Sequence, residues 1–229
     1  MIKLLVAVCC LAISLTSLAS PQSSPVVCID PGHPSETSAG ATARGLSEND
    51  LNWAVAIRVA AILKADGIGV VLTKKSRTSF VTNRQRAEIA NKAGAAMFIR
   101  LHCDYGSSRG FTWYYPAHSG RKDGVTGPPP AICAQSGELA HELNASMAAE
   151  LTGKLRGNPV KTDAATAVGS KQGGVLTGSI FSRVPTALIE MCTINQPIDA
   201  AFIASTDGQE AMATAIAHAI ERALPAHPA

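Results

Sequence analysis

Short apolar runs alternate along this chain with longer stretches in which apolar residues recur at helical spacing. The runs are continuous rather than alternating and rich in β-branched residues, so they predict buried strands at 26–29, 68–73, 96–101, 111–115 and 185–191. Helical patterns cover 48–66, 79–93, 137–155 and 208–224. This alternation predicts an α/β fold, a single three-layer αβα domain with a twisted, mostly parallel sheet flanked by helices.

The length and composition of the chain suit one globular domain. Of its 229 residues, 46% are hydrophobic and 16% are charged, which is enough to bury a sizeable core. We expect that domain at 26–225, after a short linker at 20–25. The formal net charge of +3 is too small to indicate a nucleic-acid partner.

The first residues have the pattern of a secretory signal peptide. Lys3 supplies one positive charge, the stretch from Leu4 to Leu18 is largely apolar, and small residues precede Ala19. We therefore predict a signal peptide at 1–19. The stretch is too short for a transmembrane helix, which needs about 20 apolar residues. Cys9 and Cys10 leave a lipoprotein as the weaker alternative.

Removal of that segment leaves Cys28, Cys103, Cys133 and Cys192. Four cysteines in an exported protein permit two disulfides in three pairings, and the sequence does not choose among these. Buried free thiols are the other reading, because a domain of this size does not require disulfides.

Polar side chains stand where the predicted strands end. His33 follows the first strand, His102 ends the third and Glu190 ends the last. Glu48 lies in the first turn of a helix that Ser47 is expected to cap. Because sites form at the carboxyl ends of parallel strands, these groups should share one rim. Two His and one carboxylate form a known ligand set of catalytic zinc, and a further carboxylate can move a proton.

Several sequence blocks resemble a known enzyme family. Asp30-Pro-Gly-His33 and Gly45-Leu-Ser-Glu48 are similar to the opening of the zinc-dependent N-acetylmuramoyl-L-alanine amidases of type 3. The segments 83–102 and 184–190 are similar to later blocks of that family, in the same order. The resemblance spans nearly all of the predicted domain.

The resemblance implies a role for each residue at the rim. His33, Glu48 and His102 would be zinc ligands, and Glu190 the catalytic carboxylate. The family's fold, a twisted sheet between helices, agrees with the pattern above. Its substrate is peptidoglycan, in which it cuts the amide between the lactyl group of N-acetylmuramic acid and L-Ala of the stem peptide.

Two positions beside the second His depart from the family. The family usually has Ser two residues before it and Asn two residues after it, whereas this chain has Arg100 and Asp104. The change should alter the local polarity and the contact with substrate. Asp30 is a candidate support for the metal site, and Arg86 is expected to stabilise the fold by pairing.

Two other functions remain open at this point. One is a zinc peptidase that cuts within the stem peptide, and the other is a non-catalytic wall-binding protein on the same fold. In each case we expect a monomer that acts in the periplasm or cell envelope, or is secreted. We expect neither a nucleic-acid partner nor stable insertion in a membrane.

Overall fold

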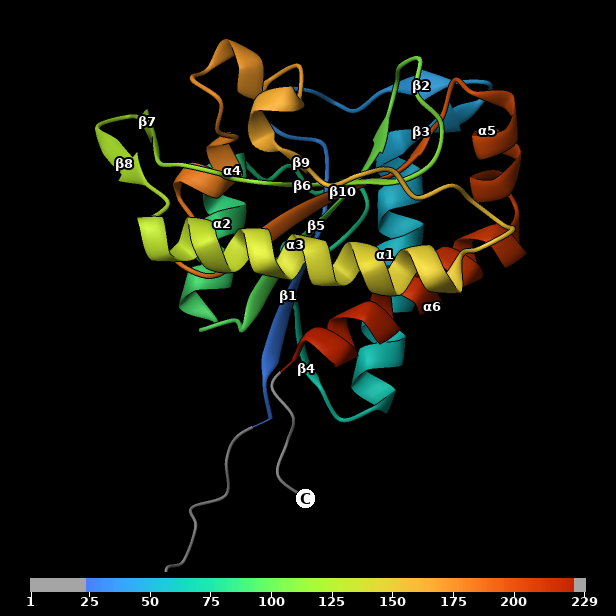
Figure 1. The fold of residues 1–229 in the computed structure, drawn as a ribbon, viewed down its shortest axis with the longest axis horizontal. Helices are drawn as coiled ribbons and strands as arrows, with labels where there is room; N and C mark the ends of the chain where they lie inside the picture. The colour runs from blue at the N-terminus through green and yellow to red at the C-terminus, as the bar shows by residue number, and fades with distance from the viewer. Residues whose placement is uncertain (1–23, 225–229) are drawn as a thin grey trace, which may run out of the picture.

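The computed structural model describes residues 24–224, and its centre is a six-stranded sheet (Figure 1). The strands lie in the order β4-β1-β5-β10-β6-β9. Every neighbouring pair is parallel except β10 and β6, which are antiparallel. Their bounds are β1 Val26–Pro31, β4 Gly69–Leu72, β5 Met97–Asp104, β6 Thr112–Tyr115, β9 Lys161–Thr162 and β10 Thr186–Thr193. The predicted α/β class with a mostly parallel sheet is confirmed.

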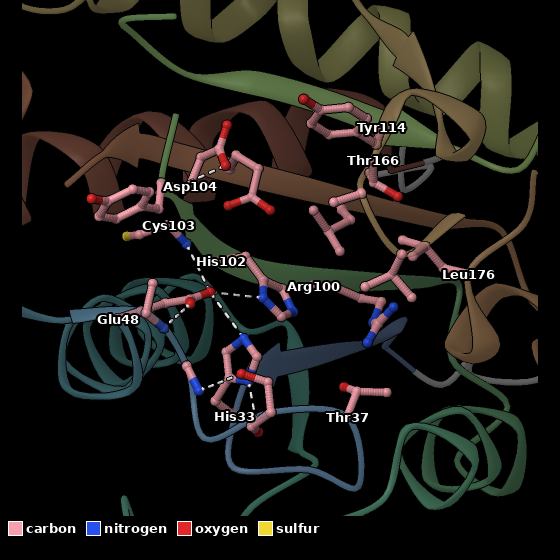
Figure 2. Close-up of a pocket in the computed structure, with 18 of the residues that line it drawn as sticks. His33, Thr37, Glu48, Arg100, His102, Cys103, Asp104, Tyr114, Thr166 and Leu176 are labelled. Carbon is pink, nitrogen blue, oxygen red and sulfur yellow. Dashed lines mark hydrogen bonds and ion pairs between the residues drawn. The ribbon is translucent and has the colours of Figure 1, made fainter. Parts of the chain in front are cut away.

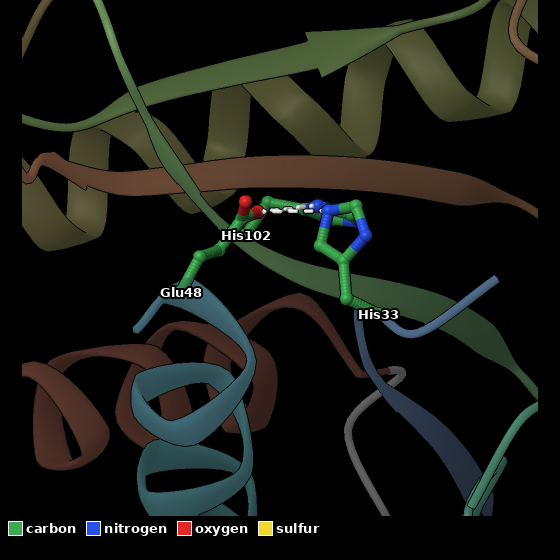
Figure 3. Close-up of side chains that lie close together, drawn as sticks. All are labelled: His33, Glu48 and His102. Atoms are coloured by element: carbon green, nitrogen blue, oxygen red, sulfur yellow. Dashed lines mark hydrogen bonds and ion pairs between the residues drawn. The ribbon is translucent and has the colours of Figure 1, made fainter. Parts of the chain in front are cut away.

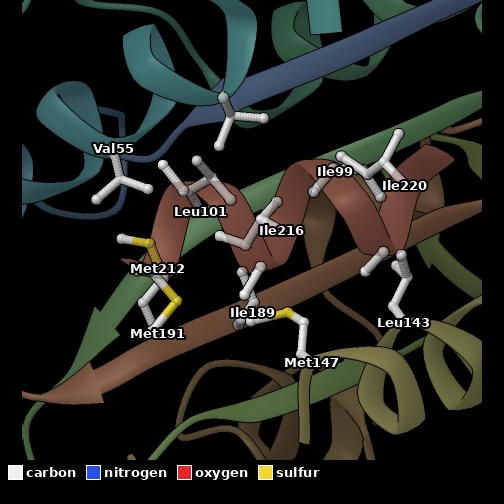
Figure 4. Close-up of a cluster of buried hydrophobic side chains, with 14 of the residues drawn as sticks. Val55, Ile99, Leu101, Leu143, Met147, Ile189, Met191, Met212, Ile216 and Ile220 are labelled. Carbon is white, nitrogen blue, oxygen red and sulfur yellow. The ribbon is translucent and has the colours of Figure 1, made fainter. Parts of the chain in front are cut away.

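Helices cover both faces of this sheet. One face carries α1 (Glu48–Ala65), α3 (Pro130–Glu150) and α6 (Thr206–Ala223), with α6 packed between the other two (Figure 4). The opposite face carries α2 (Asn83–Lys92), which packs against the short α4 (Thr177–Ile180). The remaining helix, α5 (Pro197–Ala204), contacts β10 and α6. The result is the predicted three-layer arrangement.

The two faces of the sheet have different chemistry. In β5, Ile99, Leu101 and Cys103 enter the large hydrophobic core beneath α1, α3 and α6. The alternate residues of the same strand point to the other face because successive side chains of a strand diverge. There Phe98 packs in a small separate cluster, and the polar residues that follow it remain available for a site.

Two small hairpins extend the architecture. The first joins β2 (Thr42–Ala43) to β3 (Leu46–Ser47) and leads directly into α1. The second joins β7 (Gly120–Lys122) to β8 (Val125–Gly127), inside a segment that the sequence indicates only as a Gly- and Pro-rich loop. Two 3₁₀ turns, Asp163–Ala165 and Gly169–Lys171, follow β9.

Some predicted helix boundaries are wrong. Ser79 does not cap α2; Thr82 does, in a capping box in which its side chain accepts from the Gln85 N–H and Gln85 accepts from the Thr82 N–H. Helix α3 begins at Pro130 rather than at 137, since proline is well suited to the first position of a helix.

All four cysteines in residues 24–224 are free and buried, so this structure contains none of the possible pairings. The predicted signal peptide at 1–19 lies outside the described residues. Within 24–224, each helix is too short or too polar to cross a membrane.

Candidate active site and metal centre

The four residues expected at one rim lie together. His33 follows β1, Glu48 begins α1, His102 lies in β5, and Glu190 of β10 stands directly opposite His102 in the strand register. All four line one cavity of about 400 Å³. Figure 2 labels His33, Glu48 and His102 among the residues of its wall. The strand ends and the helix start therefore converge as the parallel topology predicts.

His33, Glu48 and His102 form a compact set of donor atoms (Figure 3). Oε1 of Glu48 lies 3.1 Å from Nε2 of His33 and 3.0 Å from Nδ1 of His102. The three donor atoms all lie within 4.8 Å of one another, which makes this the one such group found among residues 24–224. The spacing is short enough for one ion to contact all three.

The backbone orients each donor. Nδ1 of His33 donates to the carbonyl of Ser38 at 3.1 Å, so the lone pair of its neutral ring is on Nε2, the atom that faces Glu48. The N–H of Ala41 donates to Oε2 of Glu48 at 2.8 Å, and the N–H of Cys103 to Oε1 at 3.2 Å. Such outer contacts fix ligand orientation in metal sites.

The protonation states suit a cation. Burial raises the pKa of the Glu48 carboxyl, but the adjacent rings of His102 and His33 outweigh burial and hold the pKa well below its usual range. Burial lowers the pKa of His102 to about 4, despite its bond to Glu48. At neutral pH Glu48 is therefore a charged carboxylate and His102 a neutral imidazole, the forms that bind metal.

Two unpaired polar atoms complete the fit. Nε2 of His102 and Oε2 of Glu190 are buried without a hydrogen-bond partner in residues 24–224. Buried polar atoms rarely stay unpaired, so these two point to a ligand or water in the cavity. Three protein donors of the type His, His and Glu fit a zinc ion and leave a fourth position open.

The approach of α1 sets the position of Glu48. Ser47 caps the helix as predicted, with its side chain accepting from the Asp50 N–H at 3.4 Å. Glu48 therefore occupies the first turn, where the helix dipole favours a negative charge. Glu48 is only 5% exposed, and the hydrogen bonds of its carboxylate offset the desolvation.

A buried ionic network holds the turn that carries His33. Asp30 contacts Arg86, Arg100 and Thr73 rather than His33 itself. Arg86 in turn donates to the carbonyls of Pro31 and Pro34 on either side of the turn. Asp30 thus supports the site through Arg86, whose predicted pairing role is confirmed. The pKa of Asp30, which burial would raise, is held well below its usual range by the two guanidinium groups.

The same turn has a strained and crowded backbone. His33 has a φ of 60°, in the left-handed region that costs an ordinary residue about 1–2 kcal/mol. Gly32 packs directly against the ring of His102, because a Cβ atom at Gly32 would lie 2.5 Å from Nε2 and 2.8 Å from Nδ1. Only glycine allows this approach without displacing the ring.

Gly32→Ala should therefore lower the affinity for zinc by about 10- to 100-fold, the effect of losing an outer support of a ligand. Gly106→Ala is the matched control, because its Cβ would meet nothing closer than 3.5 Å. Competition with a chromophoric chelator measures both affinities. Equal zinc affinity in the Gly32 variant and the control would show that the ring of His102 does not depend on this contact.

Other residues of the cavity wall have no distinctive pattern in the sequence. Ala165 ends the first 3₁₀ turn, and Thr166, Ala167 and Val168 lie between the two turns, in a segment that the sequence indicates only as loop. Tyr114 and Leu188 supply an apolar wall from β6 and β10. Arg100 and Asp104, the two departures noted above, also line the cavity. Arg100 and Asp104 lie two residues before and two residues after His102 in one strand, and this spacing could have placed them on the same face as His102.

Comparison with known proteins agrees with this geometry. The model of the N-acetylmuramoyl-L-alanine amidase family matches residues 27–222. The chain is 30% identical over 192 residues to the N-acetylmuramoyl-L-alanine amidase LytC of Bacillus subtilis, covering 81% of this chain and 33% of LytC. It therefore spans about a third of that relative. It is 25% identical to the amidase Rv3717 of Mycobacterium tuberculosis, covering 81% of this chain and 72% of Rv3717.

Solved structures share the fold. The amidase AmiC2 of Nostoc punctiforme superposes with a TM-score of 0.69 at 25% identity, covering 86% of this chain and 96% of AmiC2. The CwlV catalytic domain from Bacillus (Paenibacillus) polymyxa gives a TM-score of 0.68 at 24% identity, covering 86% and 97% of the two chains. The family match covers almost the whole described domain. The chain belongs to the N-acetylmuramoyl-L-alanine amidase family, and it is an amidase of peptidoglycan.

Proposed function

We propose that the chain hydrolyses the amide between the lactyl group of N-acetylmuramic acid and L-Ala of the stem peptide. In this proposal His33, Glu48 and His102 hold a zinc ion and Glu190 moves the proton. The observation that carries the proposal is the juxtaposition of Glu190 with the three donors in one cavity. A binding protein would not need this unpaired carboxyl.

The ion and the carboxyl have separate tasks. When bound, zinc would lower the pKa of a water ligand towards about 7 and polarise the substrate carbonyl. Burial and the neighbouring Glu48 and Asp104 carboxylates raise the pKa of Glu190 well above its usual range. A raised pKa makes the Glu190 carboxylate a stronger base towards a proton of water than an ordinary Glu carboxylate. It then delivers that proton to the L-Ala nitrogen as the C–N bond breaks.

The location follows from the substrate. Membership of a cell-wall amidase family implies action outside the cytoplasm. We propose export to the periplasm or envelope through the predicted signal peptide at 1–19, and action as a monomer.

Product analysis tests the reaction. The chain is incubated with a disaccharide muropeptide, and the products are identified by mass spectrometry. The proposal predicts a free disaccharide and an intact peptide with an L-Ala amino terminus. Sugar that retains L-Ala would instead identify a zinc peptidase. Intact muropeptide that co-purifies with the protein would identify a wall-binding protein.

A further inference from the structure

Strand β5 places three charged or ligating side chains in a row. Arg100, His102 and Asp104 are alternate residues of one strand, so they share its cavity-facing side. The candidate metal ligand thus has a cation on one side and an acid on the other. In Figure 2, Arg100 lies near Thr37 and Leu176, whereas Asp104 lies at the opposite end of the labelled group. The cavity is electrically polarised along the strand.

Two hydrogen bonds fix the Arg100 side chain and leave one of its nitrogen atoms available to a ligand. Its Nε donates to Oδ2 of Asp30 at 3.1 Å, and its Nη2 donates to Oδ1 of Asn83 at 2.7 Å. Among residues 24–224, no hydrogen bond is made by Nη1, and Arg100 lines the cavity, where this donor is available to a ligand. The arrangement favours a ligand that supplies the missing acceptor.

The charge of Arg100 is also incompletely balanced. Asp30 is shared with Arg86, whose Nη1 lies 2.5 Å from Oδ1 of Asp30. One carboxylate therefore faces two guanidinium groups.

The backbone at Gly178 leaves room for the guanidinium of Arg100. A Cβ atom at Gly178, in α4, would lie 2.7 Å from both Cζ and Nη1 of Arg100. The absence of a side chain there lets the guanidinium rest against the backbone. A guanidinium fixed in this way is preorganised to donate from Nη1 to a carboxylate oxygen.

We propose that Arg100 binds a carboxylate of the substrate peptide, so that the stem peptide lies on the Arg100 side of the metal centre and the sugar on the Asp104 side. The inference rests on the proposed amide cleavage and names the substrate class that the site prefers. Residues two apart on a strand are separated by about 7 Å. The second residue of an extended peptide lies about 7 Å beyond the first amide. The carboxylate in question therefore belongs to the stem-peptide residue after L-Ala.

A pair of matched substrates tests this. One muropeptide carries a free α-carboxylate on the residue after L-Ala, and the other carries an amide there. The wild-type chain should cleave the acid with a kcat/KM at least about tenfold higher, the value of one charge-assisted hydrogen bond, and mainly through a lower KM. Arg100→Gln should bring the ratio of the two kcat/KM values close to one. Arg100→Lys should restore only part of it, because an ammonium lacks the planar fork.

Two further variants guard against misfolding. Gly178→Ala should reduce the ratio by displacing the guanidinium while Arg100 itself remains. Arg77→Gln, at an exposed ion pair with Asp50, should keep the wild-type ratio. Equal cleavage of both substrates by the wild-type chain, or an unchanged ratio in Arg100→Gln, would overturn the inference and leave the amidase reaction intact. Cleavage of neither substrate at the lactyl amide would overturn the proposed function as well.

Discussion

Glu190→Gln should lower kcat/KM for muropeptide cleavage by roughly 100- to 10,000-fold, the usual contribution of a general acid–base group. The amide cannot accept a proton from water or return one to the L-Ala nitrogen. Its size is nearly that of the carboxyl, so the cavity keeps its shape. The loss should appear in kcat rather than in KM, because Glu190 acts on the reacting atoms and contributes little to ground-state binding.

Stability and metal content separate this loss from misfolding. Glu190 is a buried carboxyl beside two others, so replacing it with a neutral amide should leave the Tm equal or raise it. Zinc content should stay the same because Glu190 is not one of the three grouped donors. Glu142→Gln, on the exposed side of α3, is the matched control and should retain full activity. A Glu190 variant with more than about a tenth of wild-type activity would assign the proton transfer to another group.

The sequence predicts the sheet well because its strands are buried on both faces. Continuous β-branched runs have few alternative structures, and all five predicted strands are present within two or three residues of their expected ends. Helix starts are harder. The start of α3 falls at a proline in a loop-like stretch, and α5 is too short to show a periodic pattern. Local capping contacts decide such boundaries, and several residues could make them.

Some residues of the candidate site could be predicted from the sequence and others could not. His33, Glu48, His102 and Glu190 could be placed together because topology alone brings strand ends to one edge. The loop at 165–168 could not, since its position depends on the packing of the 3₁₀ turns against the rest of the domain. Asp30 was expected near the ligand, yet it acts one contact further away, through Arg86. Sequence spacing carries no information about which side chains a buried carboxylate contacts.

Removing zinc with a chelator should abolish amide cleavage, and added zinc should restore it. The same removal should lower the Tm, because a ligand that binds only the native state stabilises it by about 4 kcal/mol at 1,000 times its Kd. For a domain of this size that corresponds to a shift of roughly 10 °C. His102→Ala should weaken zinc binding by more than about 100-fold, since loss of an outer support alone reduces affinity 10- to 100-fold. Competition titration gives the affinity without reference to activity.

A comparison of Glu48→Ala with His102→Ala distinguishes a metal centre from a purely structural hydrogen-bonded cluster. Glu48 accepts hydrogen bonds from the Ala41 and Cys103 N–H groups as well as facing both imidazoles. Its loss should therefore destabilise even the zinc-free chain, by about 1–3 kcal/mol for each buried donor left unpaired. His102→Ala removes a ligand but leaves these two donors paired, so most of its effect on Tm should appear only when zinc is present. If zinc raised the Tm of the wild-type chain and of His102→Ala equally, the three donors would not be the zinc site.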